Sequence, residues 1–130
     1  MPGTKGADRA LPSAEALLPL TPVAFEILLA LADGERHGYF IMQEVERRSG
    51  GRVNLHPGTL YRALNRLLGE GLIEEIDAPE PARPEPHDGR RRYYRVTSFG
   101  REVAAAEAER LASQLSAARL KNLVSRGDAR

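Results

Sequence analysis

The chain has 130 residues, of which 42% are hydrophobic, and this composition supports one modest core without a second domain. The formal net charge of +1 neither indicates nor excludes a nucleic-acid partner, because a sum over the whole chain hides local clusters of charge. The absence of cysteine excludes disulfides and thiolate chemistry, and no apolar run approaches the roughly 20 residues of a membrane span. We therefore expect a soluble, cytoplasmic protein without a membrane partner.

The N-terminal part of the sequence predicts a tail followed by a short helical stretch. Residues 1–12 are dominated by Gly, Pro and charged residues, carry few large apolar side chains and are expected to be disordered. Ser13 can cap a stretch that contains Leu17 and Leu18 and that ends at Pro19. This stretch is apolar enough to need a partner.

The next helix is expected to lie at the centre of the domain. Thr21 is suited to cap it, Pro22 to occupy its first position, and Asp33-Gly34 to end it. Its apolar residues fall on more than one side, which is typical of a helix buried among several others. They are Val23, Ala24, Ile27, Leu28, Ala30 and Leu31.

A further helix is predicted from about Gly38 to Ser49, where Gly50-Gly51 stops it. Apolar residues should face inward and charged residues outward. The inward set is Ile41, Met42 and Val45, and the outward set is Gln43, Glu46, Arg47 and Arg48. The tetrapeptide RVNL that follows, residues 52–55, predicts a single short strand.

The helix that begins at Pro57 has two different faces. Leucines at helical spacing predict a buried face made of Leu60, Leu64, Leu67 and Leu68. A rotation of about 100° per residue places the polar side chains on the opposite arc. These are Tyr61, Arg62, Asn65 and Arg66. Gly71 is expected to end the helix.

Two strands and a long helix complete the pattern. The segments LIEEIDA (residues 72–78) and RRRYYRVT (residues 90–97) predict strands, and the polar, proline-rich segment between them predicts an unusually long hairpin tip. Thr97 should cap a final Ala-rich helix that reaches about Ser125. The order of elements predicts a mainly α fold with a small β-hairpin (α+β), namely a winged helix-turn-helix followed by a long C-terminal helix.

The polar arc of the helix from Pro57 carries side chains suited to the major groove of DNA. Arginine can pair with guanine there and asparagine with adenine, and a Pro-Gly helix start lets a phosphate approach free backbone N–H groups. An ordinary solvated face is the alternative, but arginines also cluster on the second hairpin strand, where they could meet phosphates. The predicted DNA-binding residues are Pro57, Gly58, Thr59, Tyr61, Arg62, Asn65, Arg66, Arg90, Arg91, Arg92, Tyr93 and Arg95.

Three segments resemble the winged helix of PadR-family transcriptional regulators, namely LTPVAFEILLALADGERHGYFIMQEV, PGTLYRALNRLLGEGLIEE and RRRYYRVTSFGREV. The motifs HGY, PGTLY, GLI and Y-R-x-T-x-x-G occur in the family's order, and the resemblance covers about Leu20 to Val103. It implies a dimeric DNA-binding repressor of bacteria or archaea, paired through its first and last helices. It also implies DNA contact near Tyr61 and Arg62 and near the arginines of the wing, which is the predicted β-hairpin.

The chain departs from the family pattern at three places. His56 stands where the family usually has a capping Ser, and the wing is longer and richer in proline than usual. The chain has no Trp, so the drug binding between tryptophans that some members show is not carried over. Its single C-terminal helix resembles the shorter subgroup of the family.

The last helix has a row of apolar residues at the spacing found where two helices pack together, and we call this row the seam. It consists of Ala104, Ala108, Leu111, Leu115 and Ala118, which alternate spacings of four and three. Because the winged helix should use its core face for its own helices, we expect a homodimer to bury this seam, with Leu17 and Leu18 adding to the interface. The predicted division is a tail at 1–12, a DNA-binding domain at 13–97, a dimerisation helix at 98–125 and a tail at 126–130.

No metal site is expected among the histidines, and structural roles are expected for His37, Tyr39 and Tyr94. The three histidines are too far apart in the predicted elements for a metal site, and His37 is expected to bond at the entry to its helix. Tyr39 and Tyr94 are predicted to be core aromatics, whereas Tyr93 faces the other way and is freer to meet a phosphate.

No catalytic set is recognisable, so we expect neither an enzyme nor a cofactor. The hypothesis is a transcriptional regulator, acting as a repressor, that binds a pseudo-palindromic operator of double-stranded DNA as a homodimer. A small-molecule effector is left open and unidentified. The rival hypothesis is a winged-helix interaction module whose basic face binds an acidic protein.

Overall fold

The computed structural model describes residues 13–77 and 92–124. The predicted tails and the proline-rich loop, with Arg90 and Arg91, lie outside these residues. In chain order the elements are the 3₁₀ turn η1 (Ala14–Leu17), helix α2 (Pro22–Leu31), strand β1 (Arg36–His37), helix α3 (Gly38–Ser49), helix α4 (Pro57–Gly69), strands β2 (Ile73–Ile76) and β3 (Tyr93–Val96), and helix α5 (Ser98–Leu120). None of these helices is long and apolar enough to cross a membrane.

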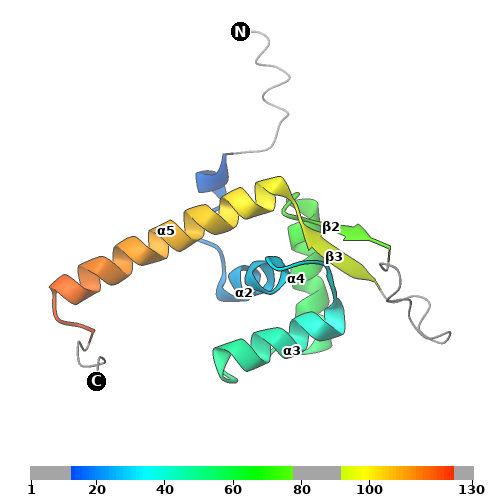
Figure 1. The fold of residues 1–130 in the computed structure, drawn as a ribbon, viewed down its shortest axis with the longest axis horizontal. Coiled ribbons are helices and arrows are strands. Elements are labelled where there is room, and N and C mark those ends of the chain that lie inside the picture. Colours follow the sequence, from blue (N-terminus) through cyan, green and yellow to red (C-terminus); the bar gives the residue numbers. More distant parts are fainter. Residues whose placement is uncertain (1–12, 78–91, 125–130) are drawn as a thin grey trace, which may run out of the picture.

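Helices α2, α3 and α4 pack around one apolar core, which the sheet and the first turns of α5 complete (Figure 1). Helix α2 contributes Ile27, Leu28 and Leu31, each at most 1% exposed, so its predicted central position is confirmed. The other fully buried side chains are Ile41, Val45, Leu60, Leu64, Leu67, Leu72, Tyr94 and Val103. The C-terminal half of α5 runs out past the other helices (Figure 1).

The sheet has three antiparallel strands in the order β1-β3-β2. Tyr93 of the central strand pairs with His37 on one side and with Ile76 on the other. The predicted strand at residues 52–55 is wrong, because Val53 donates its N–H to Ser49 Oγ at 3.0 Å instead of joining the sheet. The third strand is β1, which is only two residues long and shows no alternating pattern in the sequence.

Side-chain caps define where the helices begin. Thr21 Oγ1 accepts a hydrogen bond from the N–H of Ala24 at 3.0 Å, so the predicted cap of α2 is confirmed. The ring Nδ1 of His37 accepts from the backbone N–H three residues later at 3.2 Å, which confirms its structural role. Ser13 is different: its side chain makes no cap bond within the described residues, and the N–H of Ala16 bonds to its carbonyl instead. The expected helical stretch is therefore a single 3₁₀ turn.

Helix α5 ends at Leu120, earlier than the predicted end near Ser125. Asn122 adopts a positive φ of 62°, and the N–H of Leu123 bonds to the carbonyl of Ala118 at 2.9 Å. A left-handed residue after the last turn redirects the chain, so that a following backbone N–H can donate to a free carbonyl of that turn and close the helix.

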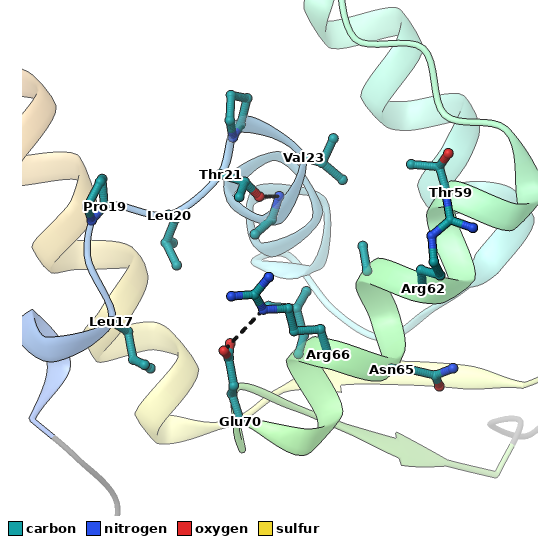
Figure 2. Close-up of a pocket in the computed structure, with 14 residues that line it drawn as sticks. Leu17, Pro19, Leu20, Thr21, Val23, Thr59, Arg62, Asn65, Arg66 and Glu70 are labelled. Atoms are coloured by element: carbon teal, nitrogen blue, oxygen red, sulfur yellow. Dashed lines mark hydrogen bonds and ion pairs between the residues drawn. The ribbon is translucent and has the colours of Figure 1, made fainter.

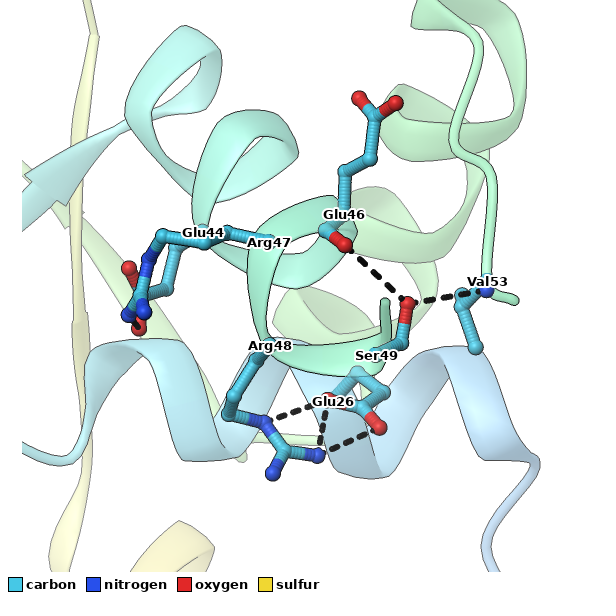
Figure 3. Close-up of polar contacts among 7 residues, drawn as sticks. All are labelled: Glu26, Glu44, Glu46, Arg47, Arg48, Ser49 and Val53. Atoms are coloured by element: carbon cyan, nitrogen blue, oxygen red, sulfur yellow. Dashed lines mark hydrogen bonds and ion pairs between the residues drawn. The ribbon is translucent and has the colours of Figure 1, made fainter. Parts of the chain in front are cut away.

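An ion pair fixes α3 against α2 (Figure 3). Arg48 donates from Nε and Nη2 to the carboxylate of Glu26 over distances of 2.6 to 3.0 Å. Such a forked contact matches the planar carboxylate and restricts sliding of the two helices. Ser49 Oγ, at the end of α3, also accepts the N–H of Val53 (Figure 3). These contacts set the position of the turn that leads into α4.

The end of α4, the base of the hairpin and the start of α5 meet at one junction, which is formed by Gly71, Thr97 and Gly100. Gly71 has a φ of 78°, and its N–H and the next one bond back to the last turn of α4, so it ends that helix as predicted. Thr97 Oγ1 donates to the Gly71 carbonyl at 2.7 Å and accepts from the Gly100 N–H at 2.9 Å. The direction of α5 is therefore tied to that of α4.

A buried carboxylate ties the N-terminal segment to α5. The side chain of Glu107 is 3% exposed and accepts the N–H of Leu20 at 3.3 Å. Arg110 donates to the same carboxylate from Nε at 3.0 Å and from Nη2 at 2.6 Å. The hydrogen bonds of Arg110, helped by that of Leu20, lower the pKa of Glu107 against the opposing effect of burial. The sequence did not predict an inward role for this residue.

We expect Glu107→Gln to lower the free energy of unfolding at neutral pH by about 1 to 3 kcal/mol, because an amide loses the charge-assisted hydrogen bonds. The folded pKa lies below the ordinary value of 4.5. The stabilisation is therefore complete above that value and is lost as the pH falls through the folded pKa. Urea denaturation between neutral and acidic pH measures this dependence, with exposed Glu109→Gln as the control. Parallel pH profiles for the wild type and Glu107→Gln would contradict the assignment.

Candidate nucleic-acid interface

Helix α4 turns a polar face away from the core. Leu60, Leu64 and Leu67 are buried as predicted, whereas Leu68 is half-buried. The opposite arc is exposed and consists of Tyr61, Arg62, Asn65 and Arg66. Arg66 Nε lies 3.3 Å from Oε2 of Glu70, the residue that follows the last residue of the helix. Arg62 makes no hydrogen bond or ion pair with any residue in the part of the chain that the structure describes. Its guanidinium is thus available to a partner.

The first turn of α4 is accessible. Pro57 and Gly58 are exposed and Thr59 is half-buried. Within the described residues the side chain of His56 makes no cap bond, so it leaves the backbone N–H groups of this turn uncapped. Tyr61 is 44% exposed, and a Cβ on Gly38 would lie 2.6 Å from its hydroxyl oxygen. Gly38 therefore leaves room for Tyr61 where α3 and α4 meet.

Arg92 and Arg95, the wing arginines that the structure describes, are paired with carboxylates of the same chain. Arg92 Nε lies 3.3 Å from Glu75 Oε2, and Arg95 Nε lies 2.9 Å from Glu74 Oε2. Arg95 also approaches Glu35 at 4.0 Å. Exposed pairs of this kind contribute little free energy and open readily. A phosphate would compete with these carboxylates for the guanidinium groups, and the sequence did not predict this pairing.

Two tyrosines lie in environments opposite to those predicted. Tyr93, expected to be free to meet a phosphate, is only 9% exposed, because β1 runs beside it and the ring of His37 lies edge-on at 5.4 Å. Tyr39, expected in the core, is 59% exposed, because apolar residues further along α3 occupy its buried face. Tyr94 is 1% exposed, as predicted for a core aromatic.

The seam on α5 is divided between this chain's core and solvent. Ala104 packs against the core, whereas Ala108 is exposed and Leu111 and Leu115 are 38% and 42% exposed. Ala118 is half-buried. The other proposed interface residues, Leu17 and Leu18, are half-buried against the chain's own core. The unburied apolar surface is thus concentrated on the part of α5 that projects from the domain.

An outward-facing helix α4 after α3, followed by the β2–β3 wing, defines the chain as a winged helix-turn-helix protein. This confirms the predicted fold class. Residues 27–106 match the transcriptional regulator PadR-like family, and the chain belongs to this family.

Two relatives resemble the chain in sequence. It is 40% identical over 95 residues to the transcriptional regulator Rv3488 of Mycobacterium tuberculosis. This match covers 72% of this chain and 78% of that protein. It is 42% identical over 86 residues to an uncharacterized 37.1 kDa protein in transposon TN4556 of Streptomyces fradiae. That match covers 66% of this chain but only 22% of the relative, so the chain spans less than a quarter of its length.

Solved structures share the fold. A transcriptional regulator from Clostridium thermocellum superposes with a TM-score of 0.61 at 26% identity, covering 79% of this chain and 90% of that one. Bacillus subtilis PadR in complex with operator DNA superposes with a TM-score of 0.54 at 22% identity, covering 66% of this chain and 46% of that one.

Proposed function

We propose that this transcriptional regulator is a repressor that binds a pseudo-palindromic DNA operator as a homodimer. The observation that carries the proposal is the exposed polar arc of α4, on which Arg62 has no partner among the described residues. The operator DNA in the Bacillus subtilis PadR structure supports the class of partner.

The proposed contacts are of two kinds: some recognise the base sequence, and others bind phosphates and position the protein on the DNA. In the major groove, the fork of Arg62 matches guanine and the amide of Asn65 matches adenine, with Tyr61 and Arg66 on the same arc. The first turn of α4, from Pro57 to Thr59, lies where its backbone N–H groups and helix dipole favour a phosphate. Phosphates beside the wing would be met by the arginines of β3 and of the preceding segment.

The exposed part of α5 supports the dimer. Apolar side chains at Leu111 and Leu115 follow helical spacing and have no core of their own to enter. Pairing of two such helices would bury them and would relate two copies of α4 by a two-fold axis. Half-sites about 34 Å apart, one turn of DNA, would suit such a pair of reading helices.

Salt dependence tests the proposal. If each subunit neutralises about four phosphates, the logarithm of the affinity should fall with the logarithm of salt concentration at a slope of roughly −7 for a dimer. A fluorescence-anisotropy titration on DNA from upstream of the chain's own gene, at several salt concentrations, measures this slope. A slope near zero on that DNA would favour the rival hypothesis of an acidic protein partner.

A further inference from the structure

A cleft of about 660 Å³ lies between the N-terminal segment and the polar face of α4 (Figure 2). One wall is formed by residues 17 and 19–24, and the other by residues of α4 between Thr59 and Leu67 together with Glu70. Its volume falls within the range of small-molecule sites in proteins. The cleft therefore shares one wall with the proposed DNA-reading surface.

The walls of this cleft are aliphatic, and its charged side chains come from α4. Leu17 and Leu20 line it from the N-terminal segment, Val23 from the first turn of α2, and Ala63 and Leu67 from α4. None of the described residues that line it is aromatic. The charged lining residues are Arg62, Arg66 and Glu70, an excess of one positive charge. Figure 2 shows the Arg66 guanidinium on the side of α4 that faces Leu20, joined to Glu70.

We propose that this cleft binds an aliphatic carboxylate, with its hydrocarbon chain along Leu17, Leu20 and Val23 and its head on Arg62 and Arg66. An aliphatic lining gives a flat aromatic ligand nothing to stack on, but it removes an alkyl chain from water effectively. Two guanidinium groups can hold a single carboxylate through charge-assisted hydrogen bonds. A medium-chain fatty acid has both of these parts.

The two arginines are free to accept such a head group. Arg62 has no partner within residues 13–77 and 92–124. Arg66 is 73% exposed, and its pair with Glu70 spans 3.3 Å. An exposed pair within one helix contributes little free energy, so a ligand carboxylate can replace Glu70 at low cost. A cationic ligand would instead be repelled by the two guanidinium groups.

The consequence for regulation rests on the proposed function. Arg62 and Arg66 are the side chains proposed to enter the major groove, so a carboxylate that engages them withdraws them from DNA. Ligand and operator would therefore exclude one another directly, and binding one should weaken the other by the same factor. This direct competition requires no movement of α5 relative to α4.

Calorimetric titration of the free protein with decanoate, below its micelle concentration, tests the site without DNA. We expect saturable binding at one site per chain. Decanol, which has the same chain without the charge, should bind about tenfold more weakly, and decyltrimethylammonium should not bind measurably. Equal affinity for decanoate and decanol would overturn the role of the arginines. Absence of decanoate binding, as when a second copy of the chain fills the cleft, would overturn the site.

One variant separates the ligand site from the DNA interface, and a second tests the contact with the carboxylate head. Val23→Trp fills the cleft from α2, outside the proposed DNA contacts, and should abolish decanoate binding while DNA affinity stays within about twofold. Arg66→Met keeps an unbranched apolar chain and should lower the affinity for decanoate while leaving the affinity for decanol nearly unchanged. Thermal unfolding of each variant checks that it folds. If Val23→Trp does not fold, Leu20→Ala, which shortens the apolar wall, should weaken decanoate and decanol alike, and unchanged affinities would overturn the site.

Competition is measured separately by adding decanoate to the protein–DNA complex. Release of DNA from the wild type but not from Val23→Trp supports mutual exclusion. Equal decanoate affinity for free and DNA-bound protein would overturn it. A protein that binds decanoate but no DNA would retain the ligand site and would contradict the proposed function and the regulation that rests on it.

Discussion

Leu111→Asp should convert the protein into a monomer and lower its operator affinity by about 100-fold or more. Leu111 is 38% exposed on the free part of α5, and a carboxylate there would be buried without a partner in a helix pair. A dimer holds its second reading helix at a high effective concentration beside the second half-site, and a monomer loses this gain. Light scattering gives the oligomeric state, and titration on operator DNA gives the affinity.

The matched control for this substitution is Ser113→Asp. Ser113 is exposed on the same helix but lies off the seam, so the variant should remain dimeric and should bind with nearly unchanged affinity. A wild-type monomer that binds its operator tightly would refute the role assigned to α5. The same holds for a Leu111→Asp dimer with unchanged affinity.

Gly100→Ala should lower the free energy of unfolding by about 3 kcal/mol or more, a large part of the 5 to 15 kcal/mol typical of a domain. A Cβ at this position would overlap the carbonyl oxygen of Leu72 and would lie 2.7 Å from Val96 Cγ2. Because the carbonyl belongs to the backbone of the Gly71–Thr97–Gly100 junction, α5 cannot take the added methyl group without moving away from α4. Urea denaturation measures the loss.

Gly69→Ala provides the comparison for Gly100→Ala. Gly69 lies in the last turn of α4, and a Cβ there would meet no atom within 4 Å. The added methyl group should leave stability unchanged or raise it by about 0.5 to 1 kcal/mol, because alanine favours the helix. Similar stability of the two variants would show that the junction does not restrict α5.

The helices could be predicted from the sequence because local chemistry determines their ends and faces. Thr21 caps α2 through a bond to the N–H of Ala24, and Gly71 ends α4 through its positive φ, so each signal acts within a few residues. The two faces of α4 follow from the spacing of its leucines. The residues of this helix that are proposed to contact DNA bases could therefore be identified from the sequence alone.

Several of the missed features depend on contacts between distant parts of the chain. Strand β1 is a strand only because β3 lies beside it, and this pairing is also what covers Tyr93. Glu107 looks like a solvent-facing residue of an Ala-rich helix until Leu20 is placed against it. The pairs of Arg92 with Glu75 and of Arg95 with Glu74 depend on the register of the hairpin, which local patterns do not specify.

The central claim is that α4 reads DNA sequence, and the most direct test compares Arg62→Ala with Arg92→Ala on operator and scrambled duplexes. We expect Arg62→Ala to cost about 1 to 3 kcal/mol on the operator and much less on the scrambled duplex, because a bidentate contact with guanine is lost. Arg92→Ala should weaken both duplexes alike, because a phosphate contact carries no sequence information. If Arg62→Ala weakens both duplexes equally while Arg92→Ala abolishes discrimination, the wing reads the sequence and the claim is contradicted.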